Sequence, residues 1–230
     1  MNSTERLMTA FQRKTPDRVP VATWLSLRLL EQITGQAPRK FLTRFADDPL
    51  NSIVKIQEDL GFDPILLTFS ELEDEVTDWP ARFARWAPEA FENWKVESKV
   101  VDRAEDSVTV QRTITTPEGV LTSAYRRERY QKWTLEHLVK AESDLELLKY
   151  RPDPKYLDIS RLTETVRTVG DRGLVLHNFP GVWYEACSVR DLVSVSTDIY
   201  ERPAWLKRYM AVLGDYLLRL LARVMESGVV

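Results

Sequence analysis

Two histidines and one cysteine are the main candidates for acid–base, nucleophilic or metal chemistry in this 230-residue chain. His177 lies within the apolar run 173–179, which predicts a buried strand. An imidazole there can transfer a proton or bind a metal near neutral pH, but a backbone carbonyl often satisfies a lone histidine on such a strand. Cys187 is expected to be a core residue, and His137 is expected on a surface helix. These residues predict no metal site.

Apolar segments that alternate with helical patterns predict an α/β fold around these residues. Buried strands are expected at 19–25, 63–69 and 173–179, and the continuous apolar run at 63–69 is typical of a parallel sheet covered on both faces. Helices are expected from Ser3, whose hydroxyl would cap the first of them, and at 27–34, 38–60, from 134 onward, at 143–148, at 159–169 and from Pro203 to a cap at Gly228.

The segment 94–130 has a different pattern, in which β-branched and aromatic residues alternate with polar ones. A turn is indicated at Pro117-Glu118-Gly119. We therefore expect two or three antiparallel strands, inserted as a hairpin into a single domain that spans 1–230.

Composition excludes several classes of protein. The chain has 32 Lys and Arg against 35 Asp and Glu, a net charge of −3, whereas a nucleic-acid binder is expected to be basic. No apolar run approaches the ~18 residues of a membrane span, so no membrane partner is expected. A single cysteine excludes an internal disulfide and fits a reducing compartment, which predicts a cytoplasmic protein.

The end of the chain has an unusual pattern. Val229 and Val230 follow the Gly228 cap and resemble the first residues of another buried strand. A sheet that ended there would have an unpaired edge, which natural sheets avoid. We therefore expect a truncated chain, a split gene product or a half that closes against another subunit.

Several segments, taken in order, resemble the uroporphyrinogen decarboxylase superfamily, which also contains the corrinoid methyltransferases. They are Thr4–Phe11 with Thr15–Val21, Phe62–Glu71, His137–Lys140 with Ser143–Leu148, Phe179–Trp183, and Asp198–Pro203 with Glu226–Gly228. The resemblance implies an incomplete TIM (β/α)8 barrel, of which this chain holds about the first half and the hairpin insertion. Active sites of such barrels lie at the carboxyl ends of the strands.

The resemblance also implies roles for particular residues. Glu71 would stand for the family's acidic residue, which stabilises positive charge on a pyrrole ring as carbon dioxide leaves; alternatively it belongs to a solvated acidic loop. With His177 and Tyr184 it makes up the expected catalytic group, although Tyr184 is equally explained by packing. Substrate binding is expected from Arg28, Trp24 and Trp183.

In the family, the arginines of an R-Q-A-G-R-Y motif bind substrate carboxylates. The corresponding segment here is 24–30, in which Arg28 is the one arginine that can take this role. The alternative is that Arg28 is a surface residue of a helix. The function implied is decarboxylation of a carboxylated tetrapyrrole without a cofactor. The alternative is a methyltransferase that uses zinc and a corrinoid, with His-x-Cys ligands beyond Val230. A second alternative is a non-catalytic half-barrel that binds other molecules. The expected partners are the small-molecule substrate and either the missing half-barrel or further copies of this chain, and activity is not expected of this chain alone.

Overall fold

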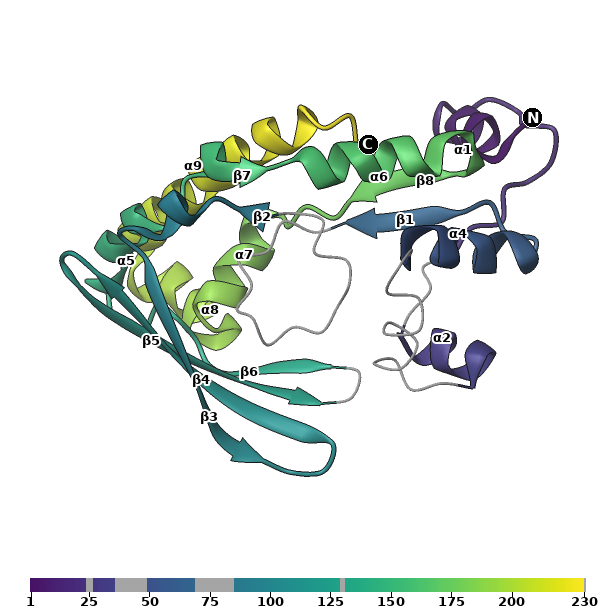
Figure 1. Cartoon of the computed structure of the whole chain (residues 1–230). Coiled ribbons are helices and arrows are strands. Elements are labelled where there is room, and N and C mark those ends of the chain that lie inside the picture. The colour runs from purple at the N-terminus through teal and green to yellow at the C-terminus, as the bar shows by residue number, and fades with distance from the viewer. Residues whose placement is uncertain (24–26, 36–48, 69–84, 129–130, 230) are drawn as a thin grey trace. The chain divides into compact units, whose positions relative to one another are not determined.

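The computed structural model describes residues 1–23, 27–35, 49–68, 85–128 and 131–229 (Figure 1). The chain divides into two compact units. The first unit comprises Met1–Arg85, Asp158–Phe179 and Val224–Val230. The second unit comprises Trp86–Leu157 and Pro180–Arg223.

A parallel pair of strands lies at the centre of the first unit. Strand β1 (Ile65–Thr68) pairs with β8 (Leu174–His177) in a register that runs from Ile65 opposite Leu174 to Thr68 opposite His177. Both buried strands expected in these regions are confirmed. The helices of this unit are α1 (Ser3–Phe11), α2 (Leu27–Thr34), α4 (Pro49–Asp59), α6 (Ser160–Val169) and the 3-10 turn η4 (Gly170–Arg172).

Buried apolar side chains hold these elements together. Helices α1 and α6 pack against β8, and α4 packs against α6. The buried residues of the first unit include Val54, Leu66, Leu162, Val169 and Leu174. Gln57 is also fully buried, and its side-chain amide donates to the Ile65 carbonyl (3.3 Å) and accepts from the Ile65 N–H (3.1 Å), which anchors the start of β1 to α4.

The second unit is built on a four-stranded antiparallel sheet. Its strands, in spatial order, are β3 (Lys95–Arg103), β4 (Ser107–Thr116), β5 (Gly119–Glu128) and β6 (Lys132–Glu136). Three helices follow in sequence: α7 (Val182–Val189), α8 (Leu192–Glu201) and α9 (Pro203–Met225). The shorter elements of the chain are β2 (Arg85–Trp86), η1 (Pro88–Phe91), α5 (Asp144–Leu147), η2 (Leu148–Tyr150), η3 (Pro154–Tyr156) and β7 (Leu157–Asp158).

The core of the second unit joins one end of the sheet to the helices. It contains Trp94, Ile114, Leu121, Val139, Leu145, Leu148, Ala186, Val189, Val195, Leu206, Tyr209 and Leu213. The buried Tyr209 hydroxyl donates to the Ala186 carbonyl at 2.9 Å, so α9 is tied to α7 by a hydrogen bond within this core.

The antiparallel strands expected at 94–130 are confirmed, but the helix expected from Thr134 is wrong. Residues Lys132–Glu136 instead form β6, which pairs with β5. Trp133 and Thr134 favour a strand, and the neighbouring β5 supplies the backbone partners that make it stable. The sheet therefore continues beyond the expected end of the insertion.

The strand expected at 19–25 is also not found in its described part, 19–23. Pro20 has no N–H to donate to a ladder, and Val19 is 80% exposed. Val21 instead makes two bonds with Asp63: its N–H donates to Asp63 Oδ2 (3.0 Å), and its carbonyl accepts from the Asp63 N–H (2.7 Å). Residues 24–25, and the part of the expected helix at 38–48, lie outside the described residues.

The predicted ends of several helices are confirmed, with one correction at the amino terminus. Gly61 and Gly170 follow α4 and α6 with positive φ angles of 76° and 57°. Asn2, not Ser3, caps α1, because the Asn2 side chain accepts from the Glu5 N–H while the Glu5 side chain accepts from the Asn2 N–H.

The fold is mixed α/β, with a parallel pair and an antiparallel sheet. No closed barrel is formed by the described residues, so the incomplete (β/α)8 barrel stays a prediction. Val229 is buried but lies in no strand. Within the described ranges, no helix is both long enough and apolar enough to cross a membrane.

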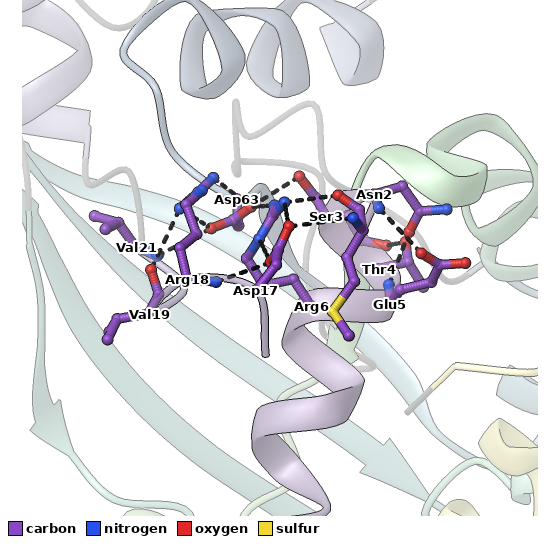
Figure 2. Close-up of polar contacts among 12 residues, drawn as sticks. Asn2, Ser3, Thr4, Glu5, Arg6, Asp17, Arg18, Val19, Val21 and Asp63 are labelled. Atoms are coloured by element: carbon purple, nitrogen blue, oxygen red, sulfur yellow. Dashed lines mark hydrogen bonds and ion pairs between the residues drawn. The ribbon is translucent and has the colours of Figure 1, made fainter. Parts of the chain in front are cut away.

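A buried carboxylate fixes the amino end of β1 (Figure 2). Asp63 is fully buried and accepts from Arg6 Nη1 (2.5 Å), Arg18 Nη2 (2.9 Å) and Ser3 Oγ (3.0 Å), in addition to the Val21 N–H. One side chain therefore joins α1, the segment after it and the start of β1.

Asp17 completes this network by accepting from Arg6 Nε (2.6 Å) and Nη2 (2.9 Å). Burial raises the pKa of Asp63, but the hydrogen bonds from Val21, Arg6 and Ser3 outweigh it and hold the pKa below the ordinary 3.8. The hydrogen bond from Arg6 likewise lowers the pKa of Asp17. Because the folded state prefers both carboxylates charged, their stabilisation is present above pH 3.8 and is lost as the pH falls through the folded pKa values.

We expect Asp63→Asn to destabilise the first unit by about 1.5–3 kcal/mol, because it removes the buried charge that Arg6 and Arg18 share and leaves Arg6 paired with Asp17 alone. Urea denaturation at neutral pH measures this loss. Asp59→Asn is the matched control, since among the described residues Asp59 pairs with Lys55 alone, on an exposed surface, and its loss should cost less than about 1 kcal/mol. Equal effects of the two substitutions would contradict the structural role of Asp63.

Gly173 is required by a close approach between backbones. A Cβ atom at this position would lie 2.2 Å from the Pro64 carbonyl oxygen, which accepts the Leu174 N–H at 3.0 Å. We expect Gly173→Ala to destabilise the β1–β8 pair by at least about 1–3 kcal/mol in a thermal or urea melt, because the strands must move apart. Gly181→Ala, where a Cβ meets nothing within 4 Å, should leave the melt nearly unchanged.

Candidate functional site

The candidate site lies where the two parallel strands end. Thr68 is the last residue of β1 and His177 the last residue of β8, and the register places them opposite each other. The carboxyl ends of parallel strands are where α/β proteins bind their ligands, because the loops that follow the strands meet there. The pair therefore occupies a position typical of an active site.

Short polar contacts define the geometry of this pair. His177 Nδ1 lies 2.8 Å from Thr68 Oγ1, and that hydroxyl lies 3.4 Å from the Leu176 carbonyl oxygen. The N–H of Asn178 donates to the Thr68 carbonyl at 2.9 Å, so the chain after β8 stays aligned with β1. Thr68 is fully buried and His177 partly buried.

These contacts favour one tautomer of the imidazole. The Thr68 hydroxyl has a single proton, and both of its contacts are satisfied when it donates to Leu176 and accepts from His177 Nδ1–H. In that arrangement Nε2 carries the lone pair and acts as a hydrogen-bond or proton acceptor.

Burial sets the charge of the imidazole. Removal of His177 from water lowers its pKa to about 4, so the side chain is neutral at neutral pH. A neutral imidazole with its lone pair on Nε2 can accept a hydrogen bond from a substrate N–H or O–H, or accept a proton. Donation from an imidazolium would require the small charged fraction, so this environment favours the acceptor role.

The other predicted site residues are distributed over both units. Arg28 lies on α2 in the first unit, with an exposed side chain. Trp183 (45% exposed) and Tyr184 (68% exposed) lie in the first turn of α7, in the second unit. Glu71 and Trp24 lie outside the described residues. Of the predicted site residues that the structure describes, His177 alone is placed in a polar pair at a strand end, and the roles of the other residues stay predictions.

The remaining two candidates for chemistry, Cys187 and His137, contact other residues of the second unit. Cys187 packs against the core of the second unit, as expected, and burial together with Asp191 raises the pKa of its thiol. His137 lies after β6, not on a helix, with Nδ1 3.0 Å from the Ser188 carbonyl oxygen. In the part of the chain that the structure describes, no group of three or more His, Cys, Asp or Glu side chains could hold a metal ion.

Sequence reasoning missed Thr68 as a partner for His177. The apolar run 63–69 predicts only a buried strand for Thr68, which lies 109 residues before His177 in the chain. The available clue was positional: a hydroxyl at the end of one apolar run and an imidazole near the end of another, in strands expected to be parallel. Pairing them required the register, which the sequence does not specify.

We expect His177 to make stability depend on pH between 6.5 and about 4. The unfolded chain binds a proton at this residue below pH 6.5 and the folded chain only near pH 4, so stability should fall as the pH falls through this range. Urea melts across the range should show a shallower dependence for His177→Gln than for the native chain. Parallel curves would show that His177 does not titrate in this way.

Comparison of the chain with protein-family models, with curated proteins and with solved structures finds no match. The similarity to the uroporphyrinogen decarboxylase superfamily therefore rests on the sequence segments alone. The site at the ends of β1 and β8 is supported by its own geometry.

Proposed function

We propose that this chain forms the first part of a uroporphyrinogen decarboxylase-like enzyme, in which His177 contacts a small carboxylated substrate at the carboxyl ends of β1 and β8. The observation that carries the proposal is the Thr68–His177 pair, 2.8 Å apart, at the ends of adjacent parallel strands. This is the position at which (β/α)8 enzymes place their catalytic groups.

The state of His177 suits a substrate that carries N–H groups. The lowered pKa keeps the imidazole neutral, and a neutral imidazole can accept a hydrogen bond from a pyrrole N–H. A neutral acceptor also does not repel the positive charge that develops on such a ring. These features fit the tetrapyrrole class that the sequence resemblance implies.

The substrate's carboxylates require cationic or hydroxyl partners. Arg28 is a guanidinium with an exposed side chain, and guanidinium groups bind carboxylates through two parallel hydrogen bonds. Tyr184 has an exposed side chain that ends in a hydroxyl. We assign Arg28 to carboxylate recognition, with Glu71 as the acidic group beside the ring, as the resemblance implies; the role that the resemblance gives to Tyr184, in the second unit, stays a prediction.

A second candidate is a non-catalytic binding protein, favoured by the exposed apolar side chains of α8. Val193 and Tyr200 are 74% and 86% exposed and lie seven residues apart, hence on one face of the helix, beside Leu192 at 56%. Exposed apolar groups of this kind mark surfaces that bind other proteins. This function would depend on Val193 and Tyr200 and not on His177.

The test is an absorbance titration of the full chain with uroporphyrin, followed by the same titration with cobalamin. We expect uroporphyrin to bind and His177→Phe to weaken binding about tenfold, because the substrate N–H loses its acceptor. His177→Gln, whose amide oxygen can still accept, should retain more affinity than the phenylalanine variant.

His137→Phe is the matched control, since His137 lies in the second unit, and it should bind as the native chain does. Binding of cobalamin alone would favour the methyltransferase alternative. If neither uroporphyrin nor cobalamin binds, the enzyme proposal is contradicted.

A further inference from the structure

We propose that Thr68 is a positioning residue, whose hydroxyl holds His177 in the tautomer that carries its proton on Nδ1. The tautomer decides which nitrogen of a neutral imidazole donates a hydrogen bond and which accepts one. The effect of Thr68 on ligand binding rests on the proposed function of His177, whereas the tautomer does not and can be measured in the chain without a ligand.

The Thr68 hydroxyl is removed from water. Thr68 is fully buried, and it is the last residue of β1, directly opposite His177 on β8. Its hydroxyl contacts His177 Nδ1 at 2.8 Å and the Leu176 carbonyl oxygen at 3.4 Å. Because a buried hydroxyl is costly without hydrogen bonds, these two contacts replace the water that it loses on folding.

The single proton of the hydroxyl distinguishes two arrangements. If Thr68 donates to His177 Nδ1, no proton of the hydroxyl is left for the Leu176 carbonyl. If Thr68 instead accepts from Nδ1–H, its proton points to that carbonyl, and both contacts are hydrogen bonds. The second arrangement makes one more bond, and bonds in a directed chain strengthen each other. We therefore assign the chain from His177 Nδ1–H through Thr68 to Leu176.

The backbone keeps this chain in register. The Asn178 N–H donates to the Thr68 carbonyl at 2.9 Å, so Thr68 contacts three consecutive residues of β8. Threonine is branched at Cβ, which restricts rotation about χ1 and hence the direction of its hydroxyl. The same residue of β1 therefore holds both the position and the orientation of the imidazole.

The assigned tautomer limits what His177 can recognise. With the proton on Nδ1, Nε2 carries the lone pair, so any group that contacts Nε2 must itself donate a hydrogen bond. A proton on Nε2 would impose the opposite requirement. Thr68 thus selects ligands that present N–H or O–H groups to His177 over ligands that present acceptors alone.

Nitrogen NMR of the imidazoles measures the tautomer directly, because protonated and unprotonated ring nitrogens resonate in different regions of the spectrum. The chain has 2 histidines, so histidine labelled with ¹⁵N gives two imidazoles, and His137→Gln identifies which is which. At about pH 8, where imidazoles are neutral, we expect His177 to carry a proton on Nδ1 and none on Nε2.

His137 is the internal standard for this spectrum. Its Nδ1 lies 3.0 Å from the Ser188 carbonyl oxygen, which can only accept, so its neutral ring should also carry the proton on Nδ1. Because His137 belongs to the second unit, its resonances should not respond to substitutions of Thr68.

Substitutions of Thr68 separate positioning from packing. Thr68→Val keeps the shape of the side chain and removes the hydroxyl, so we expect His177 to become a mixture of both tautomers and uroporphyrin to bind about fivefold more weakly. Thr68→Ser retains the hydroxyl and should keep the native tautomer and most of the affinity. A circular dichroism melt establishes that each variant is folded.

Two spectra would overturn the assignment. One is a native chain whose His177 carries its proton on Nε2, a result that does not depend on whether any variant folds. The other is a folded Thr68→Val variant that keeps the Nδ1–H tautomer.

The binding measurement is interpreted separately from the spectra. Equal affinity of the native chain and the folded valine variant for uroporphyrin would overturn the positioning role of Thr68. If the spectra agree with the assignment but the native chain binds no uroporphyrin, the proposed function is contradicted and the tautomer assignment stands.

Discussion

The buried carboxylate of Asp63 is the interaction on which the first unit depends. Placing a charge out of water is costly, and the cost is offset only when every lone pair has a donor. Ser3 and Arg6 on α1, and Arg18 and Val21 in the segment after it, supply those donors. Because the carboxylate precedes β1 and two of its donors lie on α1, the network fixes α1 beside the start of β1. It also ties down the segment that the apolar pattern at 19–25 had suggested would be a strand.

The two ends of the β1–β8 pair differ: polar contacts at the amino ends hold the backbone, and a polar pair at the carboxyl ends forms the candidate site. At the amino ends, Asp63 and the Thr4 hydroxyl, which donates to the Gly173 carbonyl at 2.6 Å, hold the backbone rigid. At the carboxyl ends, β1 and β8 finish with Thr68 and His177, a polar pair with a titratable group. Fully satisfied charges suit the end that must not move, whereas a group with an acceptor atom suits the end that meets a ligand.

Local patterns predicted the elements that local physics determines. Helix α9 follows from apolar residues at helical spacing after Pro203, and the end of α6 follows from Gly170, whose φ is positive. The two predictions that were wrong concern segments whose structure depends on distant partners. Strand β6 forms because β5 lies beside it. Residues 19–23 are held by Asp63 and not by a neighbouring strand. The same limit applied to the site. The sequence placed His177 on a buried strand, but its pairing with Thr68 comes from the register of segments 109 residues apart.

The second unit also contains a buried carboxylate that is shared by two arginines. Asp198 on α8 is fully buried and accepts from Arg190 Nε at 2.8 Å and from Arg202, while Arg190 also donates to the Lys140 carbonyl at 2.8 Å. In both units, therefore, one carboxylate shared by two arginines joins segments that the apolar core alone would leave free to slide. Apolar contacts tolerate many arrangements of similar energy, whereas a buried charge tolerates few. This accounts for how short elements, such as the four-residue strands β1 and β8, reach a single register that brings Thr68 and His177 together.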